Sequence, residues 1–306
     1  MFVLTFAMLV AIFFYGLLYS PALLLIFATS IGLYVALERY FKKKGTTMFR
    51  RKIQIATWSE SGDPTSWSKL EVNLTKTDEF IKEYNAQHPD DRITLTVIAL
   101  KSLGYAMASA GKSWGKLSFG NFIPSQSVDV TVLVNVEGDN VINALVKNCD
   151  KAGIESINAQ FKPSIKKIKR KEDKDINFQF KLVKMLPTFI VKIFLTISSF
   201  VVYELGLPFN ILKMKKNHFG NAILTNVTSF NLVDVYASHV PFTKGMLVCM
   251  LNTPELRPTV VDNQVVARKM MNINFLFDMR FIELKELADI LKTIKNVFED
   301  PKEYIK

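Results

Sequence analysis

A long apolar stretch opens the chain. Residues 1–37 contain no charged side chain, and both parts of the run, 1–20 and 21–37, are strongly apolar. Because one helix needs roughly 20 apolar residues to cross a bilayer, the pattern predicts a membrane anchor over residues 1–45. The anchor is either a hairpin of two short spans that turns near Ser20-Pro21, or one tilted span kinked at that proline. A cleaved signal peptide is a third interpretation, disfavoured by the apolar residues that continue past Pro21.

Basic residues follow the apolar run at once, with a single acidic residue, Glu38, among them. Positive charge beside a span stays on the cytoplasmic side of the membrane, or on the matrix side in a mitochondrion. The sequence therefore predicts an integral membrane protein whose globular part lies on that side. The basic residues are Arg39, Lys42, Lys43, Lys44, Arg50, Arg51 and Lys52.

Strand and helix patterns are mixed along the rest of the chain. Apolar and polar residues alternate in Trp67–Leu74, Val128–Val136 and Gln264–Phe277, whereas Leu95–Ala110 and Leu287–Phe298 have apolar residues at helical spacing. This mixture predicts an α+β sandwich. Further expected strands are Arg50–Trp58, Ala222–Val227 and Met246–Met250, and further expected helical segments are one capped by Thr77 and one over Asp139–Ala159.

A second apolar stretch, Leu186–Phe209, contains two charged residues, Lys192 and Glu204. Charges inside the stretch argue against a true membrane span. With the basic run before it, the stretch predicts a membrane-interface insert over residues 162–212, in which a helix or helix pair lies on anionic headgroups. The alternative is a lid over an apolar cleft of the domain. The expected headgroup contacts are Lys166, Lys167, Lys169, Arg170 and Lys192.

Composition narrows the choice of partners. The net charge of +11 would suit nucleic acid or an anionic membrane, but 49% of the 306 residues are hydrophobic and no nucleic-acid-binding motif is found. We therefore expect membrane lipids and no nucleic acid. The two cysteines, Cys149 and Cys249, form no metal-ligand spacing, so no metal is expected.

Several local sequences, in the right order along the chain, resemble the catalytic domain of the dihydrolipoyl acyltransferases of 2-oxoacid dehydrogenase complexes, which belongs to the chloramphenicol-acetyltransferase-like superfamily. The resemblance spans residues 49–301 and implies a chloramphenicol-acetyltransferase-like mixed-sheet sandwich. The segments that carry it are Arg50-Arg51-Lys52-Ile53, Ser127-Val128-Asp129-Val130, Val260–Arg268 and Phe277–Pro301.

The family's active-site motif reads Asp-His-Arg-x-x-Asp-Gly, and here Met279, Glu283 and Leu284 replace the histidine, the second aspartate and the glycine. The resemblance implies that the histidine deprotonates a thiol of CoA or dihydrolipoamide. It also implies that a serine or threonine hydrogen-bonds the oxyanion and that the aspartate pairs with an arginine. A thioether has no proton to exchange and cannot be a general base.

The other site positions are also altered. Alignment places Asn226 at the oxyanion hydroxyl, and an amide can still donate a hydrogen bond. Glu283 is expected to form a structural ion pair with Arg50 or Arg51. The chain has three histidines. His88 and His218 are expected at the surface, and His239, in a loop before a strand, is the alternative base.

The expected function is that of a catalytically degenerate, acyltransferase-like membrane protein with a structural or interaction role. Catalytic activity is less expected than its absence. The family builds its site between subunits of a three-fold ring, so a homotrimer or a subunit of a larger membrane complex is expected. Two alternatives stay open. One is a membrane-bound, CoA-dependent acyltransferase, and the other is a protein that binds acyl-CoA or lipid without turnover. A CoA thioester is the one ligand of cofactor type that these alternatives require.

Overall fold

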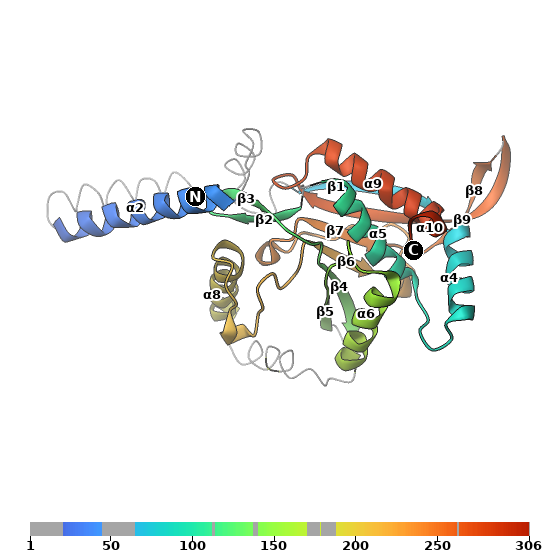
Figure 1. Ribbon diagram of the computed structural model, residues 1–306, viewed down its shortest axis with the longest axis horizontal. Coiled ribbons are helices and arrows are strands. Elements are labelled where there is room, and N and C mark those ends of the chain that lie inside the picture. Colours follow the sequence, from blue (N-terminus) through green and yellow to red (C-terminus); the bar gives the residue numbers. More distant parts are fainter. Residues whose placement is uncertain are drawn as a thin grey trace.

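The computed structural model of this protein describes residues 21–44, 65–111, 114–136, 140–169, 178, 188–261 and 263–305. Its centre is a seven-stranded sheet with strand order β1-β9-β7-β6-β4-β5, and β8 pairs with β9 outside this path (Figure 1). The strands are β1 (Thr65–Asn73), β4 (Val130–Val136), β5 (Asn140–Val146), β6 (Ala222–Asn226), β7 (Leu247–Leu251), β8 (Glu255–Val261) and β9 (Gln264–Asp278). A separate hairpin consists of β2 (Gly115–Ser118) and β3 (Asn121–Pro124).

The sheet is mixed, because β6 runs parallel to both β4 and β7 while the other pairs are antiparallel. Parallel neighbours require crossover segments between them, and helices supply part of these. The helices of the main domain are α4 (Thr75–Gln87), α5 (Leu95–Ser109), α6 (Ile154–Lys169), α9 (Leu284–Glu299) and α10 (Pro301–Tyr304). The predicted α+β class with a mixed sheet is confirmed.

One face of the sheet packs against these helices and forms the main core. In β6 and β9 alternate residues such as Leu224, Ile273 and Phe275 point to this face, as the two-residue period of a strand requires. The apolar side of α9 meets them through Leu287, Ile290 and the residues one and two turns further on. The opposite face carries a smaller buried cluster around Ile223, Val248, Met250 and Leu276.

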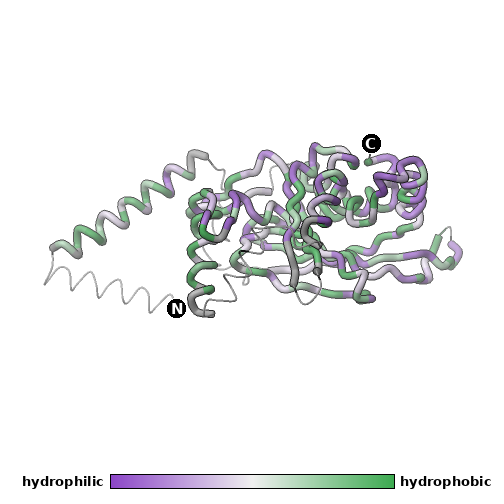
Figure 2. Tube along the Cα trace, turned by 90° about the horizontal axis from the view of Figure 1, so that it is seen from below, coloured by the Kyte–Doolittle hydropathy of each residue, from purple (hydrophilic) through white to green (hydrophobic). Residues whose placement is uncertain are grey.

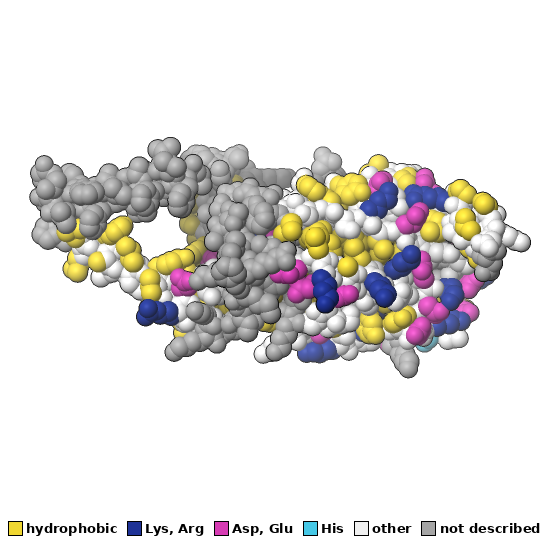
Figure 3. Space-filling model, turned by 90° about the horizontal axis from the view of Figure 1, so that it is seen from above, with side chains coloured by type: hydrophobic (Ala, Val, Ile, Leu, Met, Phe, Trp, Pro, Cys, Tyr) yellow, Lys and Arg dark blue, Asp and Glu magenta, His cyan; other side chains and the backbone are white. Residues whose placement is uncertain are grey.

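Two helical segments lie apart from this core. Helix α2 (Pro21–Lys44) projects from the domain, and its described side chains are mostly exposed and apolar (Figures 2 and 3). Within the described residues it contains one stretch, Leu24–Phe41, long and apolar enough to cross a membrane, a test that a signal sequence also passes. The second segment is α8 (Thr188–Ser199), which continues into a π-helical turn, η1 (Phe200–Glu204). Residues 1–20, and with them the choice between hairpin and kinked span, lie outside the described residues.

Most of the expected elements are found, and two need correction. The segment Asp139–Ala159 is not continuously helical, because residues 140–146 form β5 against β4 and the helix begins only at Ile154. Thr77 does not cap α4: it is buried inside the helix, and its hydroxyl donates to the carbonyl of Phe298. The expected strand Arg50–Trp58 lies outside the described residues.

Gly104 in α5 shows how closely the helix layer packs. A Cβ at this position would lie 2.3 Å from the carbonyl carbon of Cys149 and 2.7 Å from the amide nitrogen of Asp150. Both are backbone atoms, so the neighbour cannot move aside as a flexible side chain would. Glycine is therefore required here by the close approach of the chain that follows β5.

We expect Gly104→Ala to destabilise the protein although alanine favours helix by up to about 1 kcal/mol. The backbone clash with Cys149 belongs to the overpacking class, which costs about 1–3 kcal/mol or more. Urea unfolding of the detergent-solubilised chain measures the change in the free energy of unfolding. Ser109→Ala, at the end of the same helix, should change the free energy of unfolding by less than about 0.5 kcal/mol. A Gly104→Ala protein as stable as the parent would contradict this packing.

Candidate functional site: the turn that ends β9

The turn that ends β9 is held by a buried ion pair between Asp278 and Arg280. Arg280 donates from Nε at 3.0 Å and from Nη2 at 2.6 Å to the two carboxylate oxygens of Asp278. The Arg280 backbone N–H also donates to Asp278 Oδ1. Both side chains are inaccessible to solvent, with 4% and 0% exposure. A buried, bidentate pair of this kind fixes the turn between its two ends.

Met279 lies between the paired residues, and its partly buried side chain packs against the main core. The backbone around it is pinned further, because Asp278 N–H donates to the Met246 carbonyl and Phe281 N–H donates to the Asp278 carbonyl. The backbone of the turn that carries the Met279 thioether is therefore held on both sides of this residue.

Glu283 begins α9 as its N-cap. Its side chain accepts the backbone N–H of Glu286, and Glu286 Oε2 in return accepts the N–H of Glu283 at 3.0 Å, which completes a capping box. A carboxylate at a helix N-terminus is also favoured by the helix dipole. The expected partners Arg50 and Arg51 lie outside the described residues, so the structural ion pair stays a prediction.

Asn226 ends β6, and its amide is engaged within the chain. Its Nδ2 donates to Thr96 Oγ1 on α5 at 3.1 Å. Its Oδ1 accepts both the backbone N–H and the hydroxyl of Thr228, at 3.0 and 2.7 Å. This is a local turn motif of the kind that asparagine side chains commonly form. The amide expected at the oxyanion position thus ties β6 to α5 and to η3 (Thr228–Phe230).

Within one chain, Asn226 and Met279 lie towards opposite ends of the sheet. Strand pairing sets Asn226 opposite Leu251, and Leu251 opposite Ile273. Asp278 follows Ile273 by five positions along β9, which is about 17 Å at the usual rise per residue. The two predicted site residues are not brought together by the fold of a single copy.

Two histidines are found at the sheet end that carries Met279. His239 contacts the Gly245 carbonyl through Nε2, and Gly245 directly precedes Met246, the partner of Asp278. His218 lies before β6, half-buried against Phe219 rather than on the surface. Burial, helped by Lys215, lowers the pKa of His218, so its ring is neutral at neutral pH. No hydrogen bond joins either ring to the turn at Asp278 within the described residues.

Strand register was the signal that could have placed these histidines. His218 and His239 each precede a strand, β6 or β7, that enters the sheet at the level where β9 ends. The surface position predicted for His218 is wrong, whereas the loop position before a strand predicted for His239 is confirmed. The register that joins them depends on pairing between distant strands, which a single sequence does not specify.

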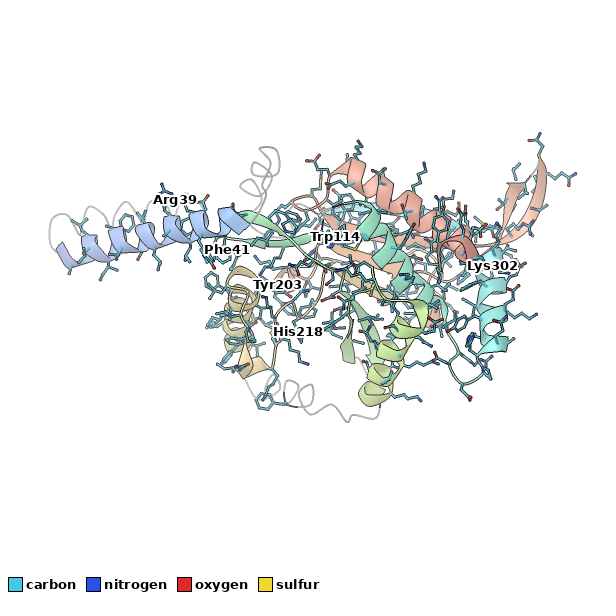
Figure 4. All side chains as sticks on the ribbon, viewed as in Figure 1. Arg39, Phe41, Trp114, Tyr203, His218 and Lys302 are labelled. Atoms are coloured by element: carbon cyan, nitrogen blue, oxygen red, sulfur yellow. The ribbon has the colours of Figure 1, made fainter. Side chains whose placement is uncertain are left out.

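An aromatic cluster joins α2, the β2–β3 hairpin and η1. Phe119, at the hairpin turn, stacks on Phe41 of α2 with ring centroids 5.2 Å apart and meets Phe200 of η1 edge-on at 6.0 Å. Tyr34, two turns earlier in α2, also meets the Phe119 ring. Figure 4 labels Phe41 at the domain end of α2, with Tyr203 of η1 on the same side of the molecule.

Glu204 fastens the same region by polar contacts. Its Oε2 accepts the Phe119 N–H at 2.6 Å, its carbonyl accepts the Ser118 hydroxyl, and its Oε1 lies 3.5 Å from Lys244 Nζ. The carboxylate that interrupts the apolar stretch therefore binds the insert to the domain. It is held by a backbone donor and a cation instead of facing lipid.

The expected headgroup residues fall on different elements. Lys166 is exposed on α6, which packs on α5 and β5 in the main domain. Lys167 and Lys169 end the same helix and Lys192 is in α8, but their side chains lie outside the described part, as does Arg170. The described parts of residues 162–212 thus lie both in the helix layer, at the end of α6, and in the α8–η1 segment with the residues that follow it.

Removing the carboxylate of the turn should be costly. We expect Asp278→Asn to lower the free energy of unfolding by about 3–5 kcal/mol, because the buried, bidentate ion pair with Arg280 would be broken. Glu83→Gln is the matched control: its pair with Lys302 is more than half exposed on both sides and should contribute about 0–1 kcal/mol. Equal losses in the two variants, measured by urea unfolding, would show that the turn does not depend on this pair.

Comparison with known proteins finds similarity to the same family in the C-terminal part of the chain. Residues 210–305 match the family model of the 2-oxoacid dehydrogenases acyltransferase (catalytic domain). The dihydrolipoyllysine-residue acetyltransferase component 5 of the chloroplastic pyruvate dehydrogenase complex of Arabidopsis thaliana is 22% identical over 69% of this chain and 37% of its own length. The lipoamide acyltransferase component of the branched-chain alpha-keto acid dehydrogenase complex of Pseudomonas putida is 34% identical over 29% of this chain and 21% of its own length. The chain thus spans well under half the length of either relative.

Solved structures share the fold over most of the chain. A probable dihydrolipoamide acetyltransferase from Listeria monocytogenes superposes with a TM-score of 0.58 at 14% identity, covering 85% of this chain and 94% of that one. The cubic core of a pyruvate dehydrogenase multienzyme complex gives 0.59 at 12% identity, covering 85% and 93%. A dihydrolipoamide acetyltransferase from Azotobacter vinelandii, solved to study a serine, a histidine and an asparagine in its catalytic mechanism, gives 0.58 at 12% identity over 85% and 93%. This protein therefore has the fold of the 2-oxoacid dehydrogenase acyltransferase cores, and its residues 210–305 match their catalytic domain.

Proposed function

We propose that this chain is a membrane-anchored protein of the dihydrolipoamide acyltransferase type that has lost acyl-transfer chemistry and acts as a structural or interaction subunit. The observation that carries the proposal is Met279 in an otherwise intact turn. Loss of a general base costs about 10²–10⁴-fold in rate. The buried pair of Asp278 and Arg280 keeps the frame, so the missing base reflects a changed side chain in a preserved fold.

The oxyanion position supports the same conclusion. A donor that stabilises an oxyanion must point to where the negative charge develops. Asn226 donates instead to Thr96, and its carbonyl oxygen receives two hydrogen bonds from Thr228. The amide therefore connects β6 with α5 and η3. Two of the three roles expected from the family, the general base and the oxyanion donor, are then left without a suitable side chain.

A homo-oligomer is proposed from the β8–β9 hairpin. The paired ends of these strands project from the body of the molecule (Figure 1) and expose Leu256, Val260 and Val265, at 77%, 66% and 74%. Large apolar side chains on a projecting hairpin are typical of interfaces. The relative named as a cubic core is a multi-copy assembly. A trimer, in which one copy brings its Asn226 end towards the Met279 end of the next, fits the separation of these residues in one chain.

Membrane attachment is proposed from α2 together with α8. The exposed apolar residues Ile193, Ile197 and Phe200 follow at the i, i+4, i+7 spacing of one helix face, and Leu207 and Ile211 extend the exposed apolar surface. The aromatic cluster at Phe119 places this segment beside the end of α2. We favour an interfacial helix next to a spanning helix, with the domain on the side of the basic flank, cytoplasmic or matrix. Membrane lipids, and a larger membrane complex, are then its partners.

Acetyl transfer from acetyl-CoA to dihydrolipoamide tests the loss of chemistry. We expect the purified chain to transfer acetyl groups no faster than its Asn226→Ala variant. We also expect no large gain in Met279→His, since Asn226 is engaged by Thr96 and Thr228. A rise of about 100-fold or more in Met279→His would mean that the rest of the site is competent, and would favour a surviving acyltransferase. Unchanged thermal unfolding of the two variants is the control for folding.

The hairpin makes a separate prediction about assembly. Introducing a charge by Val265→Asp should break the proposed oligomer into smaller species, because an unpaired carboxylate would be buried in an apolar contact. Lys285→Glu, an exposed site on α9, changes charge without touching the hairpin and should leave the assembly intact. Light scattering of the detergent-solubilised protein distinguishes the two. A monomeric parent protein, or a Val265→Asp protein of unchanged size, would remove the hairpin from the interface.

A further inference from the structure

A cavity of about 390 Å³ lies between the β2–β3 hairpin, η1 and the loop before β6. Lys116 enters its wall from β2, Tyr203 from η1, and Lys216 with Asn217 from the loop. The chain just after β3 supplies Ser125 and Ser127. Among the described residues that line the cavity, two are cations and none is an acid. Its chemistry is that of a site for an anion.

Hydrogen-bond donors accompany the two lysines. Ser125 Oγ accepts from Asn221 Nδ2 at 2.9 Å, which leaves the serine's own O–H to donate. Two carboxylates of the described residues near this region accept other donors: Asp129 accepts from Asn217 and from the backbone of Asn148, and Glu204 accepts from Phe119 and pairs with Lys244. An anion in the cavity would face the ammonium groups of Lys116 and Lys216 and the hydroxyl of Ser125.

Tyr203 adds a neutral donor. The residue is 4% exposed, and its hydroxyl makes no hydrogen bond of normal geometry within the described part of the chain, although the Phe219 backbone lies close enough to influence it. Burial raises the pKa of this phenol above its ordinary value, so it keeps its proton. A buried hydroxyl without a partner costs free energy, and a ligand oxygen that enters the cavity would remove that cost.

The cavity lies next to the end of α2. Lys116 precedes Phe119 by three positions on the hairpin, about 10 Å along a strand, and Phe119 stacks on Phe41 of α2. Asn121 of β3 also lies within hydrogen-bond reach of the Glu38 carbonyl. On the α8 side, Tyr203 follows Phe200, whose ring touches Phe119. The polar layer of a bilayer is about 5–8 Å deep on each side, a depth close to the separation of Lys116 from Phe119. A headgroup beside the end of α2 would therefore lie near the cavity wherever α2 crosses a membrane.

We propose that this cavity binds the phosphate-bearing headgroup of an anionic membrane phospholipid, an inference that rests on the proposed membrane placement of α2. Its volume is near the small end of the range of roughly 300–1,000 Å³ for ligand sites. That size suits a headgroup. The aromatic cluster of Phe41, Phe119 and Phe200 continues the site on the apolar side, where the acyl chains of such a lipid would leave.

The test is titration of the full chain, in non-ionic detergent, with fluorescent short-chain phosphatidic acid and with phosphatidylcholine of the same chain length. We expect tighter binding of the anionic lipid. Lys116→Gln combined with Lys216→Gln should weaken it on the order of tenfold or more, since charge-assisted hydrogen bonds are lost. Lys285→Gln combined with Lys292→Gln makes the same change of net charge on the exposed side of α9 and should leave binding unchanged. An equal loss in both double variants would overturn a site in the cavity.

Two further arms separate the alternatives. Tyr203→Phe removes only the hydroxyl and should weaken phosphatidic acid binding while thermal unfolding stays as in the parent; unaltered affinity would exclude the phenol from the site. Inorganic phosphate should compete poorly, because it lacks the apolar part that lies along Phe119. Competition as strong as that of the lipid would overturn the lipid assignment in favour of a free-phosphate site.

The arms also distinguish failure of the pocket from failure of the proposed function. Binding in detergent does not require insertion of α2, and alkaline extraction of membranes reports separately on whether the chain is anchored. If the chain is extracted as a soluble protein but still binds phosphatidic acid through Lys116 and Lys216, the membrane placement fails and the anion site stands. A firmly anchored chain without lysine-dependent binding overturns the pocket and leaves the anchor.

Discussion

The burial of β9 constrains most of this fold. Residues 270–278 of the strand are buried without interruption, between β1 on one side and β7 on the other. Its first half continues beyond the body and pairs with β8. One strand thus holds the centre of the sheet, reaches out as the projecting hairpin, and ends in the turn at Asp278. A shift of β9 by one residue would exchange its two faces and would move both the hairpin and the turn.

The sequence predicts one face of β9 and misses the other. The alternation through Met271, Ile273, Phe275 and Phe277 marks the residues of β9 that face the main core. The polar residues between them, Asn272 and Asn274, are buried as well, and their amides donate to the carbonyls of residues 233 and 235 in the loop that crosses the other face. Local periodicity reports that two faces differ in polarity, but it cannot report that a distant loop covers the polar one. The same limit explains β5, whose partner β4 decides its conformation.

The residue types of the candidate site could be predicted from the sequence, but their arrangement in space could not. From the sequence, Met279 is expected at the position of the family's histidine, and the structure adds that the surrounding turn is closed by the buried ion pair of Asp278 and Arg280. Glu283 was expected to serve an ion pair, and its described role is to cap α9. Asn226 was aligned to an oxyanion donor, and the parallel pairing of β6 with β7 puts it at the far end of the sheet from Met279. Long-range register determines these relations, and each requires pairing information that no single segment contains.

Glu204 connects the α8–η1 segment with the part of the domain that carries the Asp278 turn. In the sequence, Glu204 is a charged residue that interrupts the apolar stretch Leu186–Phe209. In the structure it accepts the Phe119 N–H and pairs with Lys244, directly before Gly245 and the β7 strand that abuts the Asp278 turn. The insert is therefore fixed to the domain by a carboxylate with defined partners, while Phe119 fixes α2 to the same hairpin. The polar contacts of Glu204 and the ring contacts of Phe119 thus meet at the β2–β3 hairpin, where α2 and the α8–η1 segment contact the domain.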